Sequence, residues 1–250
     1  MSATTVTSYK KIRQTIGALG IALPMLIYIH TGIVGCCWQL QDSISHYFYT
    51  TGTVFFEGVL WILGLVLIYY PAYKDEKRGD VMLTSLSGAF AWSVALIPTN
   101  NNSEDSCSIL KFPPNSDLRN YIHLACAASM LLIFSYISIN LFTRSNSKNY
   151  NDKNPVKWKN IRNWIYKTCG WFIVMSIVTI GVLSILEANG NTIPFKYTFW
   201  FEVTSIVSFG IAWLVKGGFL FTDQGEASTV EHAKNLFFKT KRIGANPKIL

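Results

Sequence analysis

Three histidines and two glutamates of this 250-residue sequence lie in or beside long apolar stretches, where an ionisable group is costly and needs a partner. They are His30, His46, His123, Glu57 and Glu202. Imidazole nitrogens are common zinc ligands, and a carboxylate can act as general base on a zinc-bound water. One hypothesis is therefore a zinc site formed by His30, His46 and His123, in a membrane hydrolase that acts on a lipid.

The spacing of these residues matches no standard metal motif. The sequence contains no HExxH, no pair of histidines at i and i+4, and no CxxC. A zinc ion would have to be held by residues from separate elements. Zinc is the only cofactor that these residues suggest. No catalytic group can be assigned, so the sequence leaves open whether the protein is an enzyme.

A second hypothesis is a polar pocket that holds no metal. Hydroxyl, amide, imidazole and carboxylate groups recur at one end of the predicted helices, where they could bind a small molecule, an ion or a lipid headgroup. Such a pocket would serve a sensing, accessory or transport role. Its residues would be Ser43, Ser45, His46, Tyr49, Glu57, Asn100, His123 and Glu202. The alternative is that each of these groups bonds a neighbouring loop and only stabilises the fold.

The elements that must position these residues are helices that cross a membrane. Half of the sequence is hydrophobic and only 14% is charged, against about 25% in a soluble domain. Runs of about 20 apolar residues, the length that crosses a bilayer, recur along the chain. They cover Ile16–Gly35, Val54–Tyr73, Val81–Thr99, Asn120–Phe142, Trp164–Leu186 and Tyr197–Phe219. We therefore expect an all-α bundle of six transmembrane helices over residues 16–221, with tails at 1–15 and 222–250.

The distribution of charge predicts how these helices are oriented. Of the 22 Lys and Arg residues, 19 fall in or beside the two tails and the second and fourth connections, which are therefore expected in the cytoplasm. The alternate loops hold only Lys111, Arg119 and Lys196. The prediction is a multi-pass protein of the cell membrane with both termini inside. The net charge of +8 then reflects contact with anionic lipid headgroups, and no nucleic-acid partner is expected.

This topology places the candidate histidines and both embedded glutamates near the outer ends of the helices. Three of the five cysteines lie on the same side. In an oxidising compartment either Cys36 or Cys37 could form a disulfide with Cys107, and the sequence does not decide between them. Cys126 and Cys169 fall in predicted spans, where we expect them to act as small packing residues.

Several short segments resemble a family of six-span bacterial membrane proteins. They are SISHYFYT at 43–50, ALIPTN at 95–100, IHL at 122–124 and FWFEVTSIVSFGIAWLVKG at 199–217. In this order the segments are similar to the DUF998 family and, more distantly, to six-span proteins of the Frag1/DRAM/Sfk1 type. The resemblance implies a six-helix fold in which Pro98 ends the third span and His123 opens the fourth. It implies no catalytic residues.

Overall fold

The structure is a computed structural model that describes residues 3–69, 78–101, 107–111, 113–144, 158–193 and 195–221. Every regular element in these ranges is a helix, which confirms the predicted all-α class. The long helices are α1 (Ala3–Val34), α2 (Thr53–Ile68), α3 (Arg78–Leu96), α4 (Asp117–Tyr136), α5 (Lys159–Ala188) and α6 (Tyr197–Lys216). A 3₁₀ helix, η1 (Ile44–Tyr49), lies between α1 and α2, and a π-helical turn, η2 (Ile137–Leu141), continues α4.

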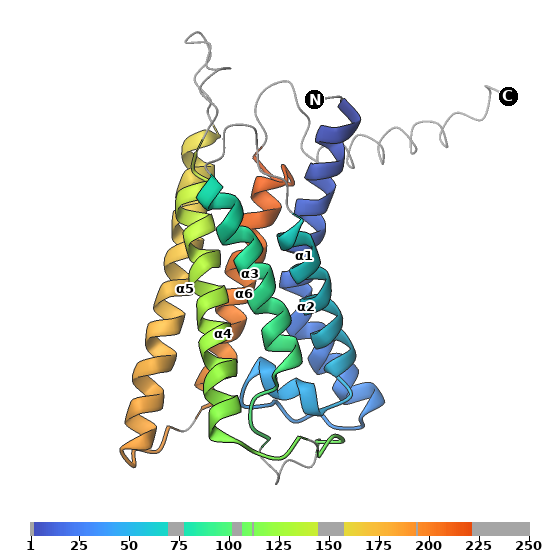
Figure 1. Ribbon diagram of the computed structural model, residues 1–250, viewed down its shortest axis with the longest axis vertical. Coiled ribbons are helices and arrows are strands. Elements are labelled where there is room, and N and C mark those ends of the chain that lie inside the picture. The colour runs from blue at the N-terminus through green and yellow to red at the C-terminus, as the bar shows by residue number, and fades with distance from the viewer. Residues whose placement is uncertain are drawn as a thin grey trace, which may run out of the picture.

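The long helices form a closed ring in chain order (Figure 1). Each helix packs on the helices that precede and follow it, and α1 packs on α6 to close the ring. Consecutive helices run in opposite directions, so the two ends of the described chain lie at the same end of the bundle. The segment that contains η1 lies across the other end.

Four of the described helices are long and apolar enough to cross a membrane. They are Lys10–Val34, Asp117–Leu141, Lys159–Ala188 and Tyr197–Lys216. The apolar helices Thr53–Ile68 and Asp80–Leu96 are shorter. All six predicted spans overlap observed helices, but α1 begins at Ala3, so much of the predicted tail at 1–15 is helical. The predicted tail at 222–250 lies outside the described residues.

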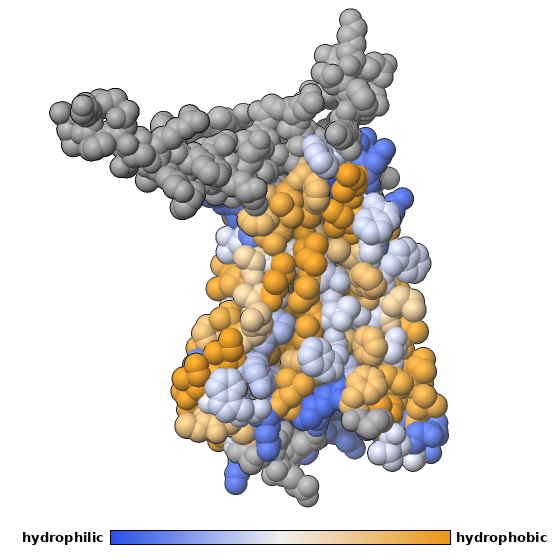
Figure 2. Space-filling view, turned by 180° about the vertical axis from the view of Figure 1, so that it is seen from behind, coloured by the Kyte–Doolittle hydropathy of each residue, from blue (hydrophilic) through white to orange (hydrophobic). Residues whose placement is uncertain are grey.

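The two ends of the bundle differ in chemistry. One end carries the disulfide between Cys37 and Cys107 together with η1, and we call it the disulfide end. The other, which we call the basic end, carries the described cations Lys10, Lys11, Arg13, Arg144, Lys159, Arg162, Lys167 and Lys216. Figure 2 shows a broad apolar band between more hydrophilic ends on one face of the molecule. An apolar band between two hydrophilic ends is typical of a protein that lies in a bilayer.

Glycines bring two pairs of helices into close contact. A Cβ atom on Gly210 of α6 would lie 2.7 Å from the carbonyl oxygen of Gly17 in α1, and one on Gly17 would lie 2.6 Å from the carbonyl of Gly210. The same relation joins α2 to α3, because a Cβ atom on Gly88 would lie 2.6 Å from the carbonyl oxygen of Gly64. Small residues allow helix backbones to approach closely in membranes.

Aromatic side chains fill the interior between the middle of the bundle and the basic end. The rings of Phe134 and Phe209 stack with centroids 3.8 Å apart. Trp213 continues the column from Phe209 to Phe142, with centroid distances of 5.6 and 5.4 Å. Lys216 closes the column, since its ammonium group donates to the carbonyl of Phe142 and lies 5.5 Å from the centre of its ring. The interior is therefore packed with aromatic rings between Phe134 and the basic end.

Candidate functional site

A cap covers the disulfide end of the bundle. We define it as the segment from Cys37 to Thr50, which includes η1, together with residues 107–111. The disulfide fixes its two parts to each other, and the backbone amides of Ile109 and Leu110 both donate to the carbonyl of Tyr49. The prediction left two partners open for Cys107; the structure pairs it with Cys37, while Cys36 is free and exposed.

Glu202 of α6 anchors the start of η1. Its carboxylate accepts hydrogen bonds from the hydroxyl of Ser43 at 2.8 and 3.0 Å and from the backbone amide of Ile44 at 2.6 Å. Ser43 is the N-cap of η1, and its oxygen also accepts from the amide of Ser45 at 3.0 Å. A carboxylate is well placed here because the first amides of a helix have no partner within the helix.

His123 of α4 holds the cap from a second helix of the ring. Its Nδ1 lies 2.6 Å from the carbonyl oxygen of Ile97, and its Nε2 lies 3.0 Å from the hydroxyl of Ser45. Since a carbonyl only accepts, Nδ1 must carry the proton in this contact, and neutral His123 then accepts from Ser45 at Nε2. The side chain is 1% exposed, so both contacts are shielded from solvent.

Ser45 and His123 have the connectivity of a nucleophile and its base, with a carbonyl in place of the third member. Ser45 is 8% exposed and lies inside η1, so a substrate does not reach its hydroxyl in this arrangement. The hydrogen bond instead ties η1 to α4. We therefore interpret this pair as a structural contact of the cap.

Tyr49 and Asn100 extend the network to the end of α3. The Tyr49 hydroxyl donates to the carbonyl of Thr99 at 2.5 Å, and burial raises the pKa of this phenol above its ordinary value, against the opposing effect of Arg119. Asn100 accepts from Arg119 at 3.1 Å and from the amide of Ser116 at 3.0 Å. The loop after α3 and the start of α4 are thus fixed to the cap by neutral and charged hydrogen bonds.

The structure brings together six of the eight residues predicted to line a polar pocket, but as a packed contact. Ser43 pairs with Glu202, Ser45 with His123, and the hydroxyl of Tyr49 with a backbone carbonyl. Asn100 belongs to the same end through its contacts with α4. His46 lies in η1 and is half-buried. For six of the eight residues, the hydrogen bonds predicted for a ligand are therefore made between protein groups.

Glu57 lies outside this network. The Oε1 atom of its carboxyl group is buried without a hydrogen-bond partner. The ring of Trp61 packs against Trp92 of α3, with centroids 5.4 Å apart. Glu57 thus lies in α2, one turn from an aromatic pair that joins α2 to α3.

The three candidate metal ligands do not form a metal site. Among the described residues, no group of three or more His, Cys, Asp or Glu side chains is arranged to hold a metal ion. Both ring nitrogens of His123 are already hydrogen-bonded. His30 lies in α1, where its ring meets the ring of Phe55 of α2 edge to face at 5.1 Å. The predicted convergence of His30, His46 and His123 is therefore not observed.

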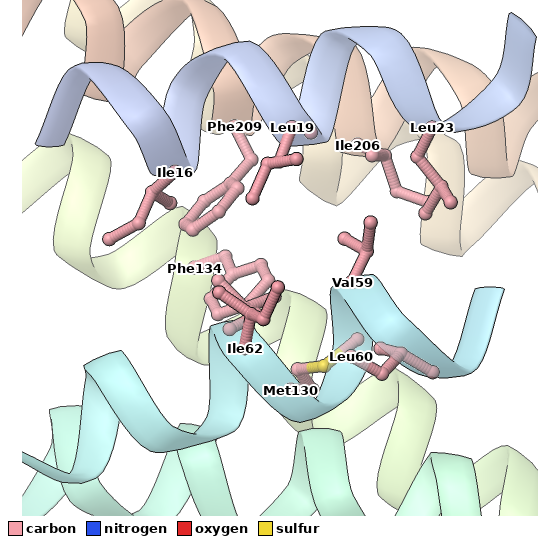
Figure 3. A pocket seen from close by; sticks show the side chains of 12 residues that line it. Ile16, Leu19, Leu23, Val59, Leu60, Ile62, Met130, Phe134, Ile206 and Phe209 are labelled. Atoms are coloured by element: carbon pink, nitrogen blue, oxygen red, sulfur yellow. The ribbon is translucent and has the colours of Figure 1, made fainter. Parts of the chain in front are cut away.

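An apolar pocket that the sequence analysis did not predict lies in the middle of the bundle. It opens between α1 and α2, with α4 and α6 behind (Figure 3). Its cavity volume is ≈ 40 Å³, and its lining is entirely apolar. The lining residues are Ile16, Leu19, Gly20, Leu23, Val59, Leu60, Ile62, Leu63, Met130, Phe134, Ile206 and Phe209.

The shape of this pocket explains why a linear pattern does not predict it. On α1 the lining residues Ile16, Leu19, Gly20 and Leu23 follow the spacing of any buried helix face. The space lies between side chains of α1, α2, α4 and α6, which only the tertiary arrangement brings together. Ile62 stands at the open side, where it is 47% exposed.

The fold and the site define the class of this protein as an all-helical bundle with several apolar helices of membrane-spanning length. Comparison with protein-family models, with curated proteins and with solved structures finds no match to the chain. The resemblance to the DUF998 family therefore stays a prediction.

Proposed function

We propose that this chain is a six-span membrane protein that binds the hydrocarbon chain of a lipid in the apolar pocket between α1 and α2, in a sensing or accessory role. The observation that carries the proposal is the entirely apolar lining of a pocket at the mid-depth of the bundle. Water finds no hydrogen-bond partners in such a lining, whereas a hydrocarbon chain needs none and fills the space with apolar contacts. Four of the polar residues predicted to bind a ligand bond one another instead, Ser43 with Glu202 and Ser45 with His123.

The ring arrangement supports six spans. The helices α2 and α3 cover ~24 and ~28 Å at 1.5 Å per residue, close to the ~30 Å of the hydrocarbon core. Each packs along a longer neighbour, α2 on α1 and α3 on α4, so all lie at the same depth. A slightly short helix costs only fractions of a kcal/mol per Å of mismatch.

Two independent features support an orientation with both termini in the cytoplasm. Cations gather at the basic end, as they do on the cytoplasmic side of membrane proteins. The disulfide at the opposite end persists in an oxidising compartment outside the cytoplasm. The cap would then face outward, and the lipid pocket would open sideways into the bilayer.

The test is photocrosslinking of the purified full-length chain in detergent micelles. The probe is a phosphatidylcholine that carries a diazirine near the methyl end of one acyl chain, and crosslinked residues are identified by mass spectrometry of peptides. We expect labelling to concentrate on the pocket residues of α1 and α2. Even labelling of the exposed apolar faces, for example along α5, would show only the ordinary lipid annulus and overturn the proposal.

A matched pair of variants sharpens this test. Ile62→Trp places a bulky ring at the open side of the pocket, on a position that is 47% exposed and therefore tolerant. Leu65→Trp makes the same change one turn along α2, at a residue that is 50% exposed and does not line the pocket. We expect Ile62→Trp to reduce pocket labelling about tenfold and Leu65→Trp to leave it unchanged.

A further inference from the structure

His30 is a polar residue on the same seam between α1 and α2 that opens into the apolar pocket. Its ring meets Phe55 of α2, at the side of α2 that also carries the pocket residues Val59, Ile62 and Leu63. The Nδ1 atom of His30 is buried and has no hydrogen-bond partner within the protein. A buried polar atom without a partner costs about 1–3 kcal/mol, so this nitrogen is a place where a ligand atom would be favoured.

Along α1 the pocket residues Leu23 and Gly20 lie ~10 and ~15 Å from His30, within the thickness of one leaflet of a bilayer. One leaflet of the hydrocarbon core is ~15 Å thick, which corresponds to ten residues of α-helix at 1.5 Å per residue. Ten residues back along α1 from His30 is Gly20, which lines the pocket. A chain whose polar end lies beside His30 and which runs parallel to α1 would therefore end inside the pocket.

The depth of His30 indicates which polar group it would meet. His30 lies four residues, or ~6 Å, before the end of α1 at Val34. At that depth, below the level of the charged headgroups, a neutral acceptor is favoured over an ionised one. The ester carbonyl at the top of an acyl chain is such an acceptor, and the Nδ1–H tautomer of His30 would donate to it.

We propose that the bound lipid is an outer-leaflet glycerolipid, with one acyl chain in the pocket and the ester carbonyl of that chain hydrogen-bonded to Nδ1 of His30. This inference rests on the proposed function and adds the orientation and the chemical class of the ligand. The chain methyl end lies near Gly20 and Leu63, and the ester end lies near His30 and Phe55. The glycerol and its headgroup lie toward the cap.

The orientation is tested with two photoreactive phosphatidylcholines on the full-length protein in micelles. In one the diazirine lies near the chain methyl end, and in the other it lies next to the ester. We expect the first probe to label Gly20 and Leu63 and the second to label His30 and Phe55. The reverse pattern would overturn the inference and leave the proposed function standing, whereas no labelling of either region would overturn both.

The role of the carbonyl is tested by competition with unlabelled lipids. An ether-linked phosphatidylcholine has the same chains and headgroup but lacks the ester carbonyl. We expect it to compete about fivefold less well than the ester lipid, which is the value of one neutral hydrogen bond. In His30→Phe, which keeps the aromatic contact with Phe55, the two lipids should compete equally. Tyr28→Phe on the same helix, whose hydroxyl bonds Trp38, serves as the control and should keep the preference.

Equal competition by ester and ether lipids in the unmodified protein would overturn the hydrogen bond to His30. A preference that survives in His30→Phe would do the same, because the carbonyl would then bind elsewhere. Both outcomes leave the methyl-end labelling of the pocket as a separate result, so the two proposals fail independently.

Discussion

Replacing His123 by Phe tests whether the polar network at the disulfide end is structural. Phe has nearly the shape of His, so packing is retained while both hydrogen bonds are lost. The carbonyl of Ile97 and the hydroxyl of Ser45 are then left in a site where the His123 side chain is 1% exposed. Each buried group without a partner costs about 1–3 kcal/mol, so we expect the two to lower the free energy of unfolding by ~2–6 kcal/mol.

The loss is measured by denaturant titration in micelles, followed by tryptophan fluorescence. Tyr121→Phe is the control, because Tyr121 is 68% exposed on the same turn of α4 and should change stability by less than ~0.5 kcal/mol. The double variant with Ser45→Ala supplies the coupling energy of the pair, expected at ~1 kcal/mol. Wild-type stability in His123→Phe, or additive effects of the two changes, would refute our interpretation of the cap.

Three further predictions follow from other contacts. Gly210→Ala should lower stability by ~1–3 kcal/mol, because the new Cβ atom would lie 2.7 Å from the carbonyl oxygen of Gly17. Gly181→Ala is the control and should not lower stability, since a Cβ atom there has nothing within 4 Å. Thermal unfolding of the two variants measures the difference. Burial raises the pKa of Tyr49, so its contribution to the free energy of unfolding is complete below the ordinary pKa of about 10 and is lost as pH rises through the higher folded value. In Tyr49→Phe, the free energy of unfolding should therefore fall less steeply with pH in the alkaline range. In intact cells a membrane-impermeant maleimide should label Cys36 and not Cys37, and labelling of both would contradict an outward disulfide.

Much of the fold could be predicted from the sequence because it depends on composition and periodicity. Runs of apolar residues located all the long helices, and the count of cations separated the two ends. The limits of α1 were less accurate, since the helix continues back through polar residues to Ala3. Hydropathy registers where a helix leaves an apolar environment and not where its backbone hydrogen bonds end.

The candidate site could be predicted only in part, for a different reason. The sequence identified Ser43, Ser45, His123 and Glu202 as polar residues at one depth, and the structure does bring them together. It could not show that their hydrogen bonds would be satisfied by each other, because that depends on how η1 lies across the ends of α4 and α6. A polar cluster inside an apolar bundle has the same composition whether it binds a ligand or fixes a loop.

The cap and the pocket together favour access from the bilayer over access from water. On the outer side of the proposed topology, Glu202 of α6 and His123 of α4 fix η1, and the disulfide fixes residues 107–111 to it. The pocket opens between α1 and α2, beside the half-exposed Ile62. A molecule that arrives through water would have to break the buried contacts of the cap, whereas a lipid chain has only to move sideways into an apolar opening.

Loosening the cap, as in His123→Phe, should therefore leave pocket labelling by a lipid probe unchanged while it lowers stability. Loss of labelling in proportion to the loss of stability would instead indicate that the cap forms part of the binding site.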